Sequence, residues 1–308
     1  HPQVVSAIKH QLDSLTHTCF QVTPYESYIA LAERLNALYP GDFEKKSMFC
    51  SAGGEAVENA IKVARYHTKR PALITFTNGY HGRSYMGMAL SARMVPFKQG
   101  FGPFPGEIFR LPFPDAFRGI TLEDTKQAFE TLFRSDCPPD QIAAIFVEPV
   151  QGEGGYNIAS GEFLTYLRAL CDTHGIVLVA DEIQSGIGRT GKMFAFEHFD
   201  VIPDILTLGK SLGAGMPIGA MVANQKLMSL LSDNPTLGHI TTFGGHPVVM
   251  AAAEAGLKVI KEEQLLDKVE AKGVLLEKLL QHASIVEIRR IGLMFALEFE
   301  SPEIVQKV

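Results

Sequence analysis

Residues 176–184 read Ile-Val-Leu-Val-Ala-Asp-Glu-Ile-Gln, and this stretch decides the fold class. Its first five residues form the most apolar strand pattern in the chain, as expected of a parallel strand that is covered on both faces. Further strands are expected at 46–50, 72–76, 142–147 and 203–208. Helical patterns lie between them, and this alternation predicts an α/β fold whose large sheet is mostly parallel, with helices on both faces.

The helical patterns between these strands are clear. Apolar residues recur at i, i+3, i+4 and i+7 within residues 57–64, and a second apolar stripe occupies residues 163–171. Another helix is expected to begin near Pro24, because proline suits the first helical turn. Each of these helices can therefore lay one apolar face on the sheet.

The pattern changes towards the end of the chain. Residues 249–281 are almost all helical, with a break near Gln264, and short strands are expected at 285–290 and 293–299. This order of elements predicts a long connecting helix that leads into a smaller α/β domain.

We therefore expect two domains. Residues 1–260 would form the large domain, of which the first ~20 residues could be a separate N-terminal segment, and residues 261–308 would begin the small domain. The chain starts at His1 without a methionine and stops at Val308, inside a helix expected over 301–308. We expect one or both termini to be missing, so that the small domain is truncated.

Composition excludes several classes of protein. The formal net charge of −6 is unlike the basic face of nucleic-acid or membrane binders, and no apolar run is long enough to span a bilayer. No signal peptide, H-E-x-x-H motif or Cys/His cluster is present, so no metal site is expected. The cysteines are widely spaced without a C-x-x-C pair, which predicts free thiols in a reducing compartment, the cytoplasm. These cysteines are Cys19, Cys50, Cys137 and Cys171.

Two candidate ligand-binding features follow expected strands. Gly53 and Gly54 lie between a strand and a helix, where free backbone N–H groups can bind a phosphate, although such a turn can equally be a tight connection. Asp181 ends the strand at 176–180 and needs a cation nearby. That cation could be a protonated ring nitrogen, a helix N-terminus or Arg189.

Two further features follow strands in the same way. Lys210 ends the strand at 203–208 within a glycine-rich loop, where desolvation would lower its pKa and favour amine chemistry. The alternative is a lysine whose ammonium group reaches solvent. Tyr80 to Arg83 could stack on a flat ligand and bind a carboxylate, or could form an ordinary surface turn. Together these features supply what a pyridoxal 5′-phosphate (PLP) enzyme needs.

Longer motifs carry a resemblance to a known family. The sequence resembles class III (subgroup II, omega-type) aminotransferases, which have the aspartate-aminotransferase fold, and within them the bacterial 4-aminobutyrate aminotransferases. The resemblance extends from His1 to about Phe299. Its most specific stretches are residues 15–22, 41–43, 55–60, 80–83, 148–155 and 181–191.

The resemblance implies roles for residues around the cofactor ring. Lys210 would form the Schiff base with PLP and move the proton between substrate and cofactor. Asp181 would pair with the pyridine nitrogen, and Gln184 would form a hydrogen bond with the ring hydroxyl. Ile183 and Tyr80 would pack on opposite faces of the ring. His81 and Glu148 are also expected among the cofactor-binding residues.

The resemblance also implies how phosphate and substrate are bound. Gly53 and Gly54 would hold the phosphate through backbone N–H groups, and Thr242 would reach the phosphate of a neighbouring subunit in a homodimer or dimer of dimers. Arg83 would bind the far carboxylate of the donor. Glu153 would line the substrate pocket beside Glu148.

Two departures from the family are evident. The family usually has serine or threonine where this chain has Gly54, so one hydroxyl contact to phosphate is absent. The arginine that the family uses for the carboxylate of 2-oxoglutarate has no counterpart before Val308.

The expected reaction moves the terminal amino group of an omega-amino acid, 4-aminobutyrate, to 2-oxoglutarate by ping-pong chemistry, giving succinic semialdehyde and glutamate. The alternatives are 5-aminovalerate, ornithine, N-acetylornithine or lysine donors, an aminomutase, and a catalytically silent PLP-fold binding protein.

Overall fold

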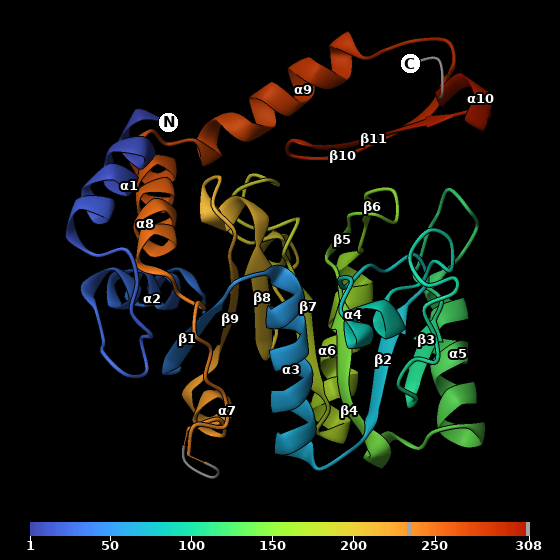
Figure 1. The fold of residues 1–308 in the computed structure, drawn as a ribbon. Helices are drawn as coiled ribbons and strands as arrows, with labels where there is room; N and C mark the ends of the chain where they lie inside the picture. Colours follow the sequence, from blue (N-terminus) through green and yellow to red (C-terminus); the bar gives the residue numbers. More distant parts are fainter. Residues whose placement is uncertain (233–235, 306–308) are drawn as a thin grey trace.

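A seven-stranded sheet forms the centre of the computed structural model, which describes residues 1–232 and 236–305 (Figure 1). The strand order is β1-β9-β8-β7-β4-β2-β3, and every strand is parallel to its neighbours except β9, which is antiparallel to both β8 and β1. This mixed sheet confirms the expected fold class. The strands are β1 (Lys45–Cys50), β2 (Ala72–Phe76), β3 (Ile108–Leu111), β4 (Ile142–Val147), β7 (Val177–Asp181), β8 (Ile205–Gly209) and β9 (Gly219–Asn224).

Strand β7 shows why the deciding stretch is apolar throughout. Val177 and Val179 face a core that contains α3, whereas Leu178 and Ala180 face the opposite side of the sheet. Both sides are covered by helices, so neither set of alternating side chains meets solvent. Asp181 is the first polar residue after this run and remains in the strand as its last residue.

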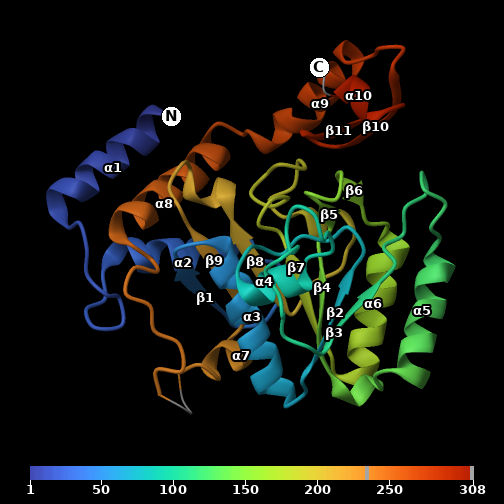
Figure 2. The ribbon, with the colours of Figure 1, turned by 45° about the vertical axis from the view of Figure 1, so that its right-hand side comes forward.

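Helices cover both faces of the sheet. One face packs against α3 (Gly53–Thr68), α4 (Tyr85–Leu90) and α7 (Gln225–Ser229). The other face packs against α2 (Glu26–Leu38) and α8 (Pro247–Glu262) near β1, β9 and β8, and against α5 (Leu122–Ser135) and α6 (Gly161–His174) near β4 and β2. Figure 2 shows α5 and α6 side by side at the β2–β3 end of the sheet.

The N-terminal helix α1 (Pro2–Ser14) was not predicted from the sequence. It packs against α8, far along the chain, and only Val4 among its side chains is buried. Val4, Ile8 and Leu12 recur every four residues, so an apolar stripe was present in the sequence and was overlooked.

The chain leaves the central sheet after α8. Gln264 adopts a positive φ of 51°, and the helical run breaks there, near the residue expected from the sequence. The short 3₁₀ helix η4 (Leu266–Lys268) and α9 (Val269–Leu279) follow, and β10 (Ile285–Ile291) pairs with β11 (Met294–Phe299) as an antiparallel hairpin. Helix α10 (Pro302–Val305) falls within the expected helix 301–308, of which residues 306–308 lie outside the described part. Figure 1 shows α9 and this hairpin above one edge of the sheet.

Among residues 1–232 and 236–305, no helix combines the length and the apolar character needed to cross a bilayer. The four cysteines are free thiols, as expected.

Candidate active site

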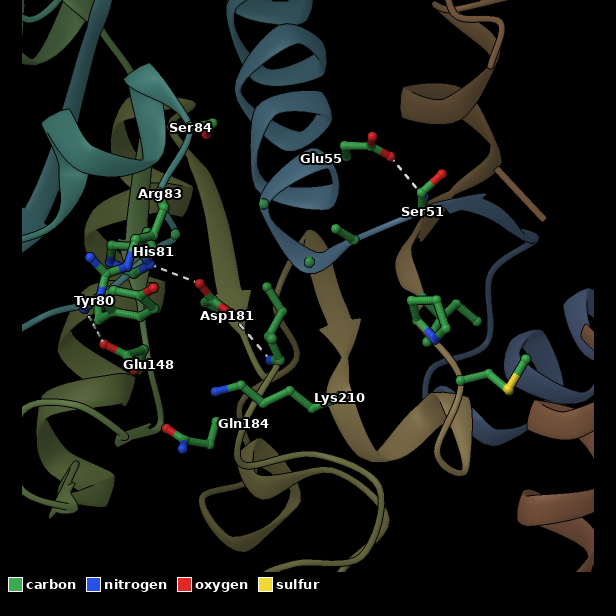
Figure 3. A pocket seen from close by; sticks show the side chains of 18 residues that line it. Ser51, Glu55, Tyr80, His81, Arg83, Ser84, Glu148, Asp181, Gln184 and Lys210 are labelled. Atoms are coloured by element: carbon green, nitrogen blue, oxygen red, sulfur yellow. Dashed lines mark hydrogen bonds and ion pairs between the residues drawn. The ribbon is translucent and has the colours of Figure 1, made fainter. Parts of the chain in front are cut away.

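Segments from six strands meet at one edge of the sheet. The parallel strands β1, β2, β4, β7 and β8 end there, and the antiparallel strand β9 begins there, so loops that are distant in sequence converge. They enclose a pocket of about 520 Å³ (Figure 3). Its lining residues are Ser51, Ala52, Gly53, Gly54, Glu55, Tyr80, His81, Gly82, Arg83, Ser84, Glu148, Asp181, Ile183, Gln184, Lys210, Met216, Pro217 and Ile218.

Asp181 lies at the pocket floor, paired with a histidine rather than an arginine. Its side chain is 4% exposed, Oδ2 is 2.8 Å from His81 Nδ1, and Oδ1 accepts from the Ile183 N–H at 3.2 Å. Arg189, the alternative partner considered from the sequence, is exposed, and among the described residues it forms no ion pair with Asp181. A buried carboxylate of this kind is stabilised by the hydrogen bonds that it accepts.

His81 is fixed on both ring nitrogens. Nδ1 faces Asp181, and Nε2 lies 3.1 Å from Thr75 Oγ1, while the backbone N–H of His81 donates to Ser91 Oγ at 2.9 Å. Burial lowers the pKa of His81, but the hydrogen bond and charge of Asp181 outweigh burial and leave this pKa raised above its ordinary value. The imidazole thus supports the negative charge of Asp181 through the 2.8 Å contact between Nδ1 and Oδ2.

Glu148 is a second buried carboxyl group in the pocket wall. Its Oε2 accepts from the Tyr80 N–H at 2.8 Å and its Oε1 from the Gly152 N–H at 3.0 Å, so it ties two loops together. Burial raises its pKa to about 7, and the charge of Asp181 adds to the rise, although His81 opposes it. A carboxyl group titrating in this range can exist in either protonation state near neutral pH.

Lys210 occupies the first position of a short 3₁₀ helix, η3 (Lys210–Gly213), directly after β8. Its φ of 44° is unusual for a residue other than glycine. The side chain is exposed, which corrects the expectation that the end of a buried strand would desolvate it. In Figure 3 it extends across the pocket between Asp181 and Gln184.

The N-terminus of α3 forms another wall of the pocket. Its N-cap residue, Ala52, provides no capping side chain, and its carbonyl accepts from the Glu55 and Ala56 N–H groups, so the Gly53 and Gly54 N–H groups remain available to an anion. A Cβ at Gly53 would lie 2.9 Å from Ile183 Cδ1, and this close packing explains that glycine. A Cβ at Gly54 would meet nothing within 4 Å, so the missing hydroxyl is not a consequence of crowding.

Tyr80 and Arg83 lie on the turn that follows β2. The Tyr80 ring packs against Phe97, with centroids 5.0 Å apart, and the Arg83 guanidinium lies over the same ring, 4.8 Å from its centroid. Arg83 is exposed, and within the described part of the chain no carboxylate forms an ion pair with it. The arginine is therefore available to a negatively charged ligand.

The structure places two of the expected residues elsewhere. Glu153 and Thr242 are exposed and do not line the pocket of this single chain, and their roles stay predictions. Gln184 does line it, beside Gly152, where a Cβ would overlap the Gln184 side chain.

Two contributors were not identified from the sequence. Thr75 could have been noticed as the single polar residue in an apolar strand. Phe97 lies in an irregular loop without helical or strand periodicity, and no motif around it indicates a role at the pocket. No group of three or more potential metal ligands occurs among the described residues.

Comparison with known proteins agrees with this geometry. The profile of the class-III aminotransferase family matches residues 1–308. The chain belongs to this family. The 5-aminovalerate aminotransferase of Pseudomonas aeruginosa is 45% identical over 97% of the chain and 70% of its own length. The 4-aminobutyrate aminotransferase of Escherichia coli is 43% identical with the same coverage.

Solved structures show the same fold. An amine transaminase from an uncultivated Pseudomonas species, determined with PLP bound, superposes with a TM-score of 0.89 at 31% identity, over 99% of this chain and 74% of its own. A taurine:2-oxoglutarate aminotransferase from Bifidobacterium kashiwanohense, in complex with PLP and glutamate, gives a TM-score of 0.90 at 28% identity, over 97% of this chain and 70% of its own. The predicted enzyme class, a PLP-dependent transaminase, is confirmed.

Proposed function

We propose that this class-III aminotransferase moves the terminal amino group of an omega-amino acid to 2-oxoglutarate, with 4-aminobutyrate as the preferred donor. The products would be succinic semialdehyde and glutamate. The observation that carries the proposal is Arg83, a cation at the pocket with no carboxylate partner among the described residues. The names of the relatives, a 4-aminobutyrate and a 5-aminovalerate aminotransferase, both refer to donors with a distal carboxylate.

The pocket fits PLP in three respects. The α3 N-terminus offers N–H groups and a favourable dipole to a phosphate, and Asp181 offers a buried negative charge to a protonated ring nitrogen. Lys210 offers a primary amine that reaches across the pocket. When bound, the cofactor supplies an aldehyde for amines and a ring that accepts the electrons released at the substrate carbon.

The residues of the chain would perform the remaining steps. Lys210 Nζ would take a proton from the donor carbon and return it to the cofactor side. Asp181 would keep the ring nitrogen protonated, with His81 holding the carboxylate in place through the 2.8 Å contact. Ile183 would contact one ring face and Tyr80 the other, with Glu148 fixing the Tyr80 backbone. Arg83 would orient the donor by its far end.

The choice of donor is the finer part of the proposal. 4-Aminobutyrate and 5-aminovalerate differ by one methylene, which a pocket distinguishes by only about 1–3 kcal/mol. Comparing kcat/KM for both donors with 2-oxoglutarate tests the preference. A value for 5-aminovalerate well above that for 4-aminobutyrate would reverse the order proposed here.

Replacing Arg83 with lysine should lower kcat/KM for 4-aminobutyrate roughly tenfold or more, equivalent to a loss of about 1.4 kcal/mol. Lysine keeps the charge but cannot make two parallel hydrogen bonds to a carboxylate. The neutral analogue 4-aminobutanamide has the same length and should be affected much less. Steady-state kinetics with both donors measure the difference. An equal loss for both would mean that Arg83 supports the fold or the cofactor, and its substrate role would have to be withdrawn.

We also propose a homodimer, or a dimer of dimers, in which Thr242 reaches the phosphate of the neighbouring subunit. Its support is a set of exposed apolar side chains around that residue, because such patches mark protein interfaces. Leu237, Ile240 and Phe243 are 64%, 49% and 55% exposed. Light scattering coupled to size-exclusion chromatography should show that the active enzyme is a dimer or a larger species. A fully active monomer would contradict the proposal.

We propose the same division into two domains that we expect from the sequence. Residues 1–260 would form the large domain and residues 261–308 the beginning of the small one, because the elements after Gln264 no longer belong to the central sheet. The free thiols support a reducing, cytoplasmic location.

A further inference from the structure

We propose that Phe97 is a positioning residue that holds the Arg83 guanidinium towards the donor carboxylate and thereby selects carboxylate-bearing donors. This inference rests on the role proposed above for Arg83. Phe97 does not line the pocket itself, so it would act through its neighbours and not on the substrate.

Phe97 is a buried ring shared by two residues of the pocket wall. Its side chain is 5% exposed, its centroid is 5.0 Å from that of Tyr80, and the Arg83 Cζ lies 4.8 Å from it. The Phe97 ring attracts the cation but carries no oxygen or nitrogen acceptor, so it leaves the N–H donors of Arg83 unpaired. Phe97 can therefore restrict Arg83 without competing with a carboxylate for hydrogen bonds.

The loop that carries Phe97 is itself anchored. Lys98 is 7% exposed, and its Nζ donates to the Ser91 carbonyl oxygen at 2.9 Å, while its backbone N–H donates to the Met94 carbonyl at 2.7 Å. Ser91 Oγ accepts from the His81 N–H, so Ser91 is hydrogen-bonded both to the Phe97 loop and to the turn that carries Tyr80 and Arg83. The position of the Phe97 ring is thus coupled to the pocket wall.

Among the described residues, no carboxylate pairs with Arg83 and would compete with the carboxylate of the donor. No ion pair of the described residues includes this guanidinium, and the Phe97 ring lies against it. A long exposed side chain with one fixed contact loses less rotamer freedom when it binds a ligand. Removing that contact should weaken binding of the carboxylate and leave the chemistry at the amine unchanged.

The test replaces Phe97 with leucine, which keeps an apolar side chain but removes the aromatic face. We expect kcat/KM for 4-aminobutyrate to fall roughly two- to fivefold, mainly through a higher KM, the size of a partly exposed cation–π contact. The value for 4-aminobutanamide should not change. Phe97→Tyr keeps the ring and should behave as wild type. Phe104→Leu is the matched control, because Phe104 belongs to the same loop and contacts Lys98 and Tyr85 but neither Tyr80 nor Arg83.

Three results would overturn the inference. The first is an unchanged kcat/KM for 4-aminobutyrate in Phe97→Leu, and the second is an equal fall for both donors, which would mean that Phe97 supports the pocket wall in general. The third is an additive selective loss when Phe97→Leu is combined with Arg83→Lys, where no further selective loss is expected. Should the leucine variant lose PLP or unfold, Phe97→Met takes its place under the same criteria. If Arg83→Lys is selective and Phe97→Leu is not, this inference fails while the proposed function stands.

Discussion

Replacing Lys210 with alanine should abolish transamination while the protein remains folded and binds PLP only weakly. Lys210 provides the one amine among the residues that line the pocket, and no neighbouring lining side chain can replace it as nucleophile and proton carrier. Its exposed position in the pocket means that the substitution removes few packing contacts. We expect a fall in kcat of several orders of magnitude and an almost unchanged melting temperature.

The control for this variant is Lys192→Ala. Lys192 is also exposed but does not line the pocket, so the variant should keep wild-type turnover and wild-type PLP content. Near-normal turnover in Lys210→Ala would refute the assignment of the catalytic lysine.

Asp181→Asn should lower kcat roughly a hundredfold or more, the range that follows from removing one preorganised charge contact from an active site. Asparagine has nearly the same shape, and its one carbonyl oxygen can still accept from His81, although the contact with the Ile183 N–H is lost, so the fold should change little. Because the asparagine side chain is neutral, it cannot stabilise the protonated ring nitrogen as a carboxylate does. Kinetics and thermal unfolding measured on the same preparation separate the two effects.

The matched control is Asp172→Asn. Asp172 pairs with Arg168 on the surface of α6, outside the pocket, and its loss should leave kcat unchanged. If Asp181→Asn retained most of its activity, Asp181 would be a structural partner of His81 and not a support for the cofactor.

The sequence was sufficient for features that depend on local pattern. The apolar run before Asp181 predicted a doubly covered strand, and the polar residue at its end predicted a position at the sheet edge. Lys210 and Gly53 were placed by the same reasoning, because parallel strands end at a common edge. These three residues do line one pocket.

Contacts between distant segments were beyond the sequence patterns. His81 and Asp181 are 100 positions apart, and no local signal connects them. Strand β9 was not expected either, because its antiparallel pairing with β8 and β1 is decided by the arrangement of the whole sheet. The exposure of Lys210 was misjudged because burial of a strand does not determine the burial of the residue that follows it, and Lys210 already belongs to the 3₁₀ helix after β8.

The central claim is that Lys210 binds the cofactor covalently. Borohydride reduction of the purified, PLP-loaded protein fixes such a bond, and mass spectrometry of its peptides then identifies the modified lysine. We expect a phosphopyridoxyl group on the peptide that contains Lys210, and loss of the near-visible absorbance band on reduction. A phosphopyridoxyl group on another lysine, with Lys210 unmodified, would contradict the account.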